Sequence, residues 1–238
     1  MIFTPQFTFV HMPKNAGSFV ETVLRKIYGK SGITATAHEY MVAPVLRKIE
    51  NRNPICFRTV PLQLYLRGYA EVLVHGHCSD IPKILRRKPI MAVLRDPLDR
   101  YISEYEFGWW AWSGRKHPQH DLIIQKYPHW PQKHSFEEEL EIRHEFHTQW
   151  QMNLPPGKRV GIQTELFLRF FCQDPRDLLG KGNELSCDEI VNDLFPTTFL
   201  RMSQINQDLA VFLKEQGCRD EDCSFAENHL KVLPSGRG

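Results

Sequence analysis

The sequence predicts an α/β fold with a central, mainly parallel sheet flanked by helices. Short apolar segments at 7–11 and 90–94 have the length of buried strands, and the segment 18–28 places its apolar residues at helical spacing. Strand-like and helix-like segments alternate along the chain, which is the order that a parallel sheet requires. We therefore expect ligands to bind at the carboxyl ends of the strands.

The remaining elements follow from local signals. Segments 72–75 and 197–202 are predicted as further strands, and a helix over 203–216 is closed by Gly217. Asp96 and Pro97 have the residue types of an N-cap and a first helical position, so a helix is expected to begin there. One side of this helix is expected to carry Leu98, Tyr101, Ile102 and Tyr105. The sequence at 135–138 is a capping box before a helix that extends to about 150, and shorter helices are expected at 165–171 and 187–194.

Length and composition favour one domain over residues 1–238. The net charge of +2 gives no reason to expect nucleic-acid binding. No apolar stretch approaches the roughly 20 residues of a membrane span, and no leader follows Met1, so we expect a soluble, cytoplasmic protein without a membrane anchor. The six cysteines are irregularly spaced and are expected to be reduced, although Cys218 and Cys223 are close enough for a bridge or half of a metal site.

The turn after the first strand, "MPKNAGS", has the composition of an anion-binding loop. Its small residues allow backbone N–H groups to approach an anion, the helix that follows directs its positive end toward it, and Lys14 adds a mobile charge. A glycine-containing turn with a solvated lysine is the structural alternative. The loop lacks the G-x-x-x-x-G-K-[ST] spacing of nucleotide triphosphatases.

Two more segments place polar residues at strand ends. Arg95 follows the strand at 90–94, where its forked donors suit a phosphate, and Ser103 lies two turns into the next helix. The structural alternative to phosphate binding is an ion pair of Arg95 with Asp96 or Asp99. In "VHGHCS", alternation along a strand would place His75 and His77 on one face, and a neutral imidazole there could be a general base.

Other features have weaker functional interpretations. The i, i+4 pair Arg100 and Glu104 is interpreted as structural. A zinc site formed by the two histidines with His144 and His147 is an alternative that nothing in the spacing requires. The tryptophans at 109, 110 and 112 could line an acceptor pocket or cover the sheet.

Two of these segments together resemble a known family. "HMPKNAGSFVETVL" is similar to the 5′-phosphosulfate loop of sulfotransferases, commonly Pro-Lys-Thr-Gly-[Gly]-Thr-Thr, and "VLRDPLDRYISEYEF" is similar to their 3′-phosphate segment, Arg-Asp-Pro-x-x-Arg-x-x-Ser-x-Tyr. The resemblance is closest to the carbohydrate type, including the heparan sulfate 2-O- and 6-O-sulfotransferases, which also have a segment like "VHGHCS". It covers most of residues 7–107 and about 197–217.

The resemblance implies a P-loop-like three-layer α/β fold and the donor substrate 3′-phosphoadenosine 5′-phosphosulfate (PAPS). The sulfuryl group would pass to a hydroxyl of a small-molecule or glycan acceptor, leaving 3′-phosphoadenosine 5′-phosphate (PAP), with no metal required. The implied roles are Lys14 as the stabiliser of the leaving phosphate, Arg95 and Ser103 as 3′-phosphate ligands, and His75 or His77 as the base, with a slight preference for His77. The 5′-phosphate would be held by Asn15, Ala16, Gly17 and Ser18.

The sequence departs from the family pattern within the loop. Asn15 replaces the common Thr, Ala16 replaces the first Gly, and Phe19 occupies the final Thr position. The segment 108–165 is expected to be an insertion on the acceptor side, but it does not identify the acceptor. Two alternative functions remain. A P-loop small-molecule kinase is disfavoured by the missing Walker spacing, and a nucleotide-binding module with impaired catalysis is suggested by the altered loop.

Overall fold

The computed structural model describes residues 1–28, 75–108, 117–146 and 151–229, apart from single positions 5, 82, 84, 85, 118 and 152. The chain divides into two compact units, Met1–Arg95 with Phe195–Gly238, and Asp96–Leu194. Residues 72–74 of the predicted strand at 72–75 lie outside the described residues. The tryptophans at 109, 110 and 112 also lie outside them. The predicted domain organisation, a single domain with an insertion at 108–165, stays a prediction.

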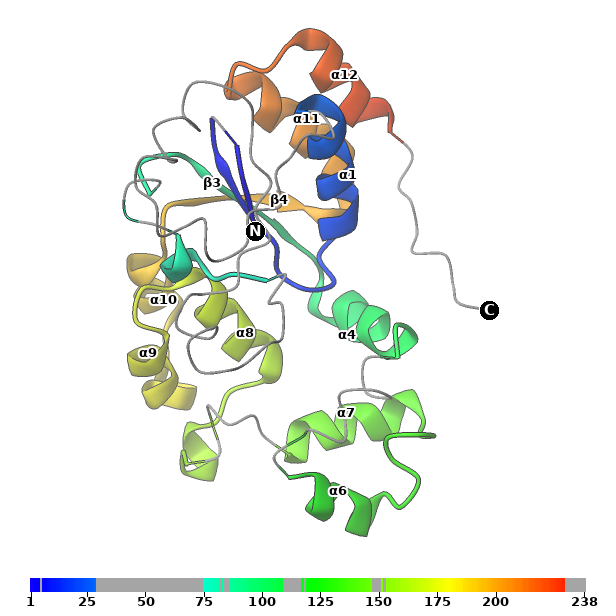
Figure 1. Ribbon diagram of the computed structural model, residues 1–238. Helices are drawn as coiled ribbons and strands as arrows, with labels where there is room; N and C mark the ends of the chain where they lie inside the picture. Colours follow the sequence, from blue (N-terminus) through cyan, green and yellow to red (C-terminus); the bar gives the residue numbers. More distant parts are fainter. Residues whose placement is uncertain are drawn as a thin grey trace, which may run out of the picture. The chain divides into compact units, whose positions relative to one another are not determined.

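The first unit is built on a sheet with the strand order β1-β2-β3-β4 (Figure 1). Its strands are β1 (Ile2–Phe3), β2 (Thr8–Val10), β3 (Ile90–Leu94) and β4 (Thr197–Arg201). β2, β3 and β4 run parallel, and β1 pairs antiparallel with β2. A mainly parallel sheet with helices is therefore confirmed, and the strand prediction at 90–94 matches β3 at both ends.

One face of the sheet packs on three helices. The register places Phe9 beside Met91 and Val93 beside Leu200, so these side chains share a face. All four are buried in one apolar cluster with residues of α1 (Gly17–Tyr28), α11 (Ile205–Glu215) and α12 (Asp220–Asn228). Residues on the opposite face, such as Val10 and Ala92, are also fully buried. Burial on both faces explains why these strands are apolar throughout rather than alternating.

Two helices of this unit, α1 and α11, lie within two residues of the bounds that the local sequence predicts, 18–28 and 203–216. α1 buries Phe19, Val20, Val23 and Leu24, which are the apolar positions that predict it. Gly217 follows α11 with a φ of 75°, the left-handed conformation that favours glycine at a helix end. α12 follows α11 at once and packs against it beside α1 (Figure 1). The sequence does not predict α12 because its acidic, apolar-poor pattern carries little helical periodicity.

The second unit is helical within its described residues. Its helices are α4 (Pro97–Glu106), α6 (His120–Lys126), α7 (Phe136–Glu145), α8 (Ile162–Phe171), α9 (Pro175–Lys181) and α10 (Cys187–Asp193). Both predicted caps are present: the Asp96 carboxylate accepts from the N–H of Leu98 at 2.9 Å, and Ser135 and Glu138 form the capping box. α6 and α9 are two helices that are not predicted, although α9 begins with Asp174 as N-cap and Pro175 as first residue, the same signal that predicts α4.

The buried side of α4 differs from the predicted apolar side. Leu98 is 56% exposed, whereas Arg100 and Glu104 are buried. The Arg100 guanidinium lies 2.6 Å from the Glu104 carboxylate, which also pairs with Arg143 of α7 at 2.9 Å. Because both carboxylate oxygens meet a guanidinium, the charge of Glu104 is compensated although it is buried. The structural interpretation of the Arg100–Glu104 pair is confirmed.

Two further findings concern the whole described part of the chain. The cysteines described there, which exclude position 56, are all free, as predicted; they include Cys218 and Cys223. Among the described helices, none has both the length and the apolar character needed to cross a membrane.

Candidate functional site

The carboxyl edge of the sheet brings together two of the predicted segments. β2 ends at Val10 and continues into the loop at 11–16, which leads into α1. β3 lies beside β2 and ends at Leu94, so Arg95 emerges next to that loop. Lys14 and Arg95 therefore occupy neighbouring positions at the sheet edge, where α/β proteins bind their ligands.

The loop has a backbone of alternating handedness. Lys14 has a φ of 64° and Ala16 a φ of 53°, whereas Asn15 between them is not among the residues with positive φ. Alternation of this kind turns successive backbone N–H groups toward one side, which forms a concave site for an anion. The Asn15 N–H itself donates to the Met12 carbonyl at 3.4 Å, so the alternation favours an anion at Ala16 and the N–H groups that follow it.

Replacing Ala16 with glycine is expected to stabilise the protein by about 1 kcal/mol. The left-handed conformation costs an L-residue about 1–2 kcal/mol, and glycine adopts it freely. Ala210→Gly in α11 is the control, and it should lower stability by about 1 kcal/mol because that alanine is in a helix interior. Urea unfolding of both variants measures the two shifts. A loss of stability for Ala16→Gly would contradict a strained loop.

Asn15 fastens the loop to the sheet. Its side chain is 2% exposed, and its amide nitrogen donates to the backbone carbonyl of Val93 in β3 at 2.8 Å. The same amide lies 3.4 Å from the sulfur of Met12. The family resemblance implies a phosphate contact for the backbone of Asn15, and the structure gives its side chain a separate role in holding the loop against β3.

Asn15→Ala is expected to lower the free energy of unfolding by about 1–3 kcal/mol. The substitution leaves the buried Val93 carbonyl without this donor, and an unsatisfied buried group costs about that much. Asn228→Ala, at an exposed position at the end of α12, serves as the control and should change stability by less than about 0.5 kcal/mol. Chemical denaturation measures both variants. Equal stability of Asn15→Ala and the wild type would show that the anchor is unimportant.

Arg95 contacts the loop directly. One terminal nitrogen of its guanidinium donates to the backbone carbonyl of Lys14 at 3.3 Å. Its Nε is buried and has no hydrogen-bond partner within the described residues. A guanidinium carries five N–H donors, so Arg95 can hold the loop with one and offer others to an anion. This contact joins the two segments that the sequence predicts as separate anion sites.

The first turn of α1 also presents donors. Ala16 at the helix start has no side chain that could cap it, and the N–H groups of Gly17, Ser18 and Phe19 meet no acceptor in the described part of the chain. Ser18 is exposed, whereas the Phe19 ring is buried in the core. Phe19 is therefore a core residue, which accounts for the missing hydroxyl at that position of the loop.

His75 is held by the same loop. Its Nδ1 lies 2.9 Å from the backbone carbonyl of His11. A carbonyl oxygen only accepts, so Nδ1 carries the proton, and in the neutral ring Nε2 carries the lone pair. The rings of His75 and His11 also meet edge to face at 4.6 Å between centroids. His75 is therefore fixed in the tautomer that a general base needs at Nε2.

His77 has a different environment. Its backbone N–H donates to the Asp80 carboxylate at 2.8 Å, and its Nδ1 lies 3.9 Å from the same carboxylate. It precedes the 3₁₀ turn η2 (Cys78–Asp80), and residues 75–77 form no strand. The strand alternation that predicts one shared face for the two histidines is thus absent here. His77 is oriented by Asp80, and His75 by the loop.

The remaining predicted residues lie in the second unit or outside the described residues. Ser103 is half-buried on α4, in the second unit, so its place beside Arg95 stays a prediction. The alternative zinc site would include His147, which lies outside the described residues. Within them, no group of three or more histidine, cysteine or acidic side chains is arranged to hold a metal ion. The structure adds His11, the first residue of the loop segment, to which the sequence assigned no role.

Comparisons with protein-family models, curated proteins and solved structures found no match.

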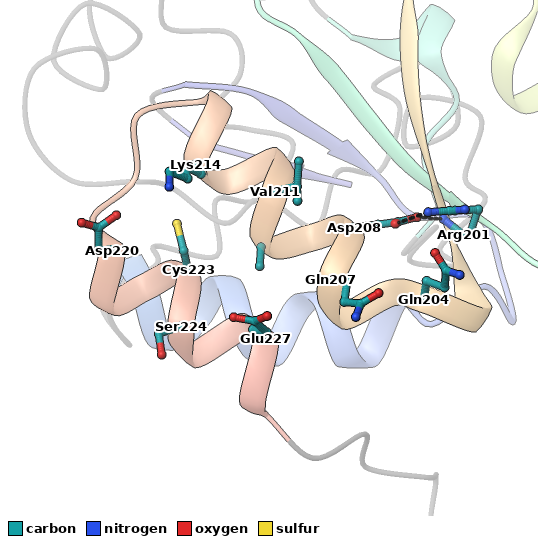
Figure 2. A pocket seen from close by; sticks show the side chains of 11 residues that line it. Arg201, Gln204, Gln207, Asp208, Val211, Lys214, Asp220, Cys223, Ser224 and Glu227 are labelled. Carbon is teal, nitrogen blue, oxygen red and sulfur yellow. Dashed lines mark hydrogen bonds and ion pairs between the residues drawn. The ribbon is translucent and has the colours of Figure 1, made fainter.

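A separate hollow lies on the outer side of α11 and α12 (Figure 2). It contains none of the predicted site residues; its lining is Arg201, Gln204, Gln207, Asp208, Ala210, Val211, Lys214, Asp220, Cys223, Ser224 and Glu227. The Arg201 guanidinium is paired with the Asp208 carboxylate at 2.7 and 2.9 Å, so its charge is neutralised. Burial raises the pKa of the Cys223 thiol, which keeps it protonated and unreactive. This hollow fits neither an anion nor a nucleophilic site.

Proposed function

We propose that this protein is a sulfotransferase that moves a sulfuryl group from PAPS to a hydroxyl of a glycan or a small metabolite. The observation that carries the proposal is the hydrogen bond from Arg95 to the Lys14 carbonyl. It joins the loop that resembles a 5′-phosphosulfate site to the segment that resembles a 3′-phosphate site. PAPS has two separated anionic groups, and two adjacent anion-binding segments match that feature. The fold assigned with this function is the P-loop-like three-layer α/β fold of the family.

The loop would stabilise the leaving phosphate. In the transfer, an acceptor oxygen forms a bond to sulfur while the bond from sulfur to the 5′-phosphate oxygen breaks. Negative charge develops on that phosphate, which the Lys14 ammonium and the N–H groups of 16–18 would stabilise as donors. Because these backbone donors are fixed by the helix and by Asn15, they require little reorganisation during the reaction.

His75 is the better-supported base. Its Nε2 lone pair can accept the proton of the acceptor hydroxyl as the oxygen attacks sulfur. His77 is oriented by Asp80, whereas His75 contacts the loop through the His11 carbonyl and ring. We therefore assign His75 as the base, in place of the slight preference for His77 that the family resemblance gives. Ser103 is retained from the resemblance as a further 3′-phosphate ligand.

Binding of PAP compared with 5′-AMP tests the assignment of Arg95. We expect the wild type to bind PAP more tightly, because only PAP has the 3′-phosphate. Arg95→Ala should weaken PAP binding by about 10–100-fold and leave 5′-AMP binding nearly unchanged, since a hydrogen bond to a charged group contributes about 1.5–3 kcal/mol. Isothermal titration calorimetry measures the four affinities. Arg87→Ala, an exposed arginine before β3, is the matched control and should bind PAP like the wild type.

The same calorimetry separates the alternatives. ATP binding as tight as PAP binding would contradict the sulfotransferase assignment and favour the kinase. PAP binding without sulfate transfer to any acceptor would favour a nucleotide-binding module with impaired catalysis. A transfer screen with labelled PAPS over sugars, phenols, alcohols and polysaccharides then identifies the acceptor class.

A further inference from the structure

His11 lies between the two parts of the proposed site. It follows β2 directly, its ring stacks on Phe9 with 5.7 Å between centroids, and it meets the His75 ring edge to face. Its backbone carbonyl lies within hydrogen-bond distance of His75 Nδ1. One residue thus contacts the proposed base through both its backbone and its side chain.

Gly17 leaves the space that the His11 ring occupies. A Cβ atom added at Gly17 would lie 1.6 Å from His11 Nε2 and 1.9 Å from Cδ2, so no larger residue fits while the ring stays in place. Gly17 is not among the glycines with positive φ, so its backbone conformation alone would accept alanine. The glycine is therefore required by the ring of His11 and not by the turn.

We propose that His11 is a positioning residue that holds the His75 imidazole beside the anion loop. The carbonyl fixes the tautomer of His75, and the ring, seated between Phe9 and Gly17, fixes the plane in which His75 lies. This proposal rests on the proposed function for the role of His75 as base. It goes beyond that function because it assigns the orientation of the base to His11, a residue to which the family resemblance gives no role.

A double-mutant cycle of Gly17→Ala and His11→Ala tests the placement of the ring. In the wild-type background, Gly17→Ala should displace the His11 ring, lower the thermal midpoint by several degrees and lower turnover. In the His11→Ala background the same change should cause no further loss, because the obstructing ring is absent. Non-additivity of this kind is the signature of two residues in direct contact. Equal effects of Gly17→Ala in both backgrounds would overturn the proposal.

Nitrogen-15 spectra of the imidazoles test the effect on His75 without using the reaction. In the wild type, His75 should give a protonated Nδ1 and an unprotonated Nε2; a His75→Ala variant assigns its signals. His11→Ala keeps the carbonyl but removes the ring that holds the plane of His75, so the hydrogen bond of Nδ1 to that carbonyl should weaken and these signals should move toward the average of the two tautomers. Retention of the single wild-type tautomer in His11→Ala would overturn the proposal.

Steady-state kinetics complete the test. His11→Ala should lower kcat about tenfold or more, while PAP affinity stays within about threefold of the wild type. Unchanged kcat together with an altered tautomer would also overturn the positioning role. If the wild type transfers no sulfate at all, the proposed function fails, and the nitrogen-15 spectra still decide whether His11 holds His75.

Discussion

Replacing His75 with alanine is expected to lower the turnover of sulfuryl transfer by about 10²–10⁴-fold, the range that a general base contributes. The substitution removes the Nε2 lone pair that would accept the acceptor proton. PAP binding should change little, because the proposed phosphate ligands are elsewhere in the loop and at Arg95. Single-turnover transfer from labelled PAPS and calorimetry with PAP measure the two effects.

His77→Ala is the matched control, because the two histidines are separated only by Gly76 and are both half-buried. Its side chain faces Asp80, so its loss should reduce turnover much less than the loss of His75. The reverse order, with His77→Ala as the more severe change, would return the base assignment to His77. Equal and small effects would exclude both as the base.

Much of the fold can be predicted from local sequence. The cap of α4 depends on Asp96 and Pro97, and the cap of α7 on Ser135 and Glu138, and these residues act within one helical turn of their own position. The strand at 90–94 is predicted by its length and continuous apolar character. Signals of this kind need no knowledge of distant contacts, which explains their agreement with the structure.

The departures in the loop could not be interpreted from sequence. Asn15 looks like a weaker substitute for a hydroxyl residue, but its amide reaches a carbonyl 78 residues away in β3. Phe19 looks like a lost phosphate ligand, but its ring completes the core between the sheet and the helices. Both roles depend on the packing of α1 against the sheet, so a pattern within the loop cannot reveal them.

The same limit applies to α4 and to Gly17. The apolar residues of α4 predict one buried side, yet a buried ion pair to Arg143 of α7 places Arg100 and Glu104 inside. Gly17 resembles a turn glycine in sequence, yet it is the ring of His11 that leaves no space for a side chain at this position. In both cases a side chain from another element decides what is buried, and only the assembled unit supplies that side chain.

Replacing Lys14 with alanine is expected to lower turnover by about 10²–10³-fold, as the loss of one charge-stabilising donor does in other enzymes. The ammonium would act mainly on the phosphate as it leaves, so kcat should fall more than the affinity for PAP. Lys26→Ala, an exposed lysine in the last turn of α1, is the control and should retain full activity. Steady-state transfer assays at saturating PAPS compare the two variants.

A glycine at the same position separates the role of the charge from the conformation of the loop. Lys14 has a φ of 64°, so lysine and alanine both bear the cost of the left-handed conformation, and glycine does not. Lys14→Gly should therefore lose as much activity as Lys14→Ala. Its free energy of unfolding should nevertheless be about 1 kcal/mol higher than that of Lys14→Ala. A protein that retains a strained lysine in a loop where glycine would be more stable has a reason to do so other than folding. Wild-type turnover in Lys14→Ala would remove that reason, and the proposed mechanism with it.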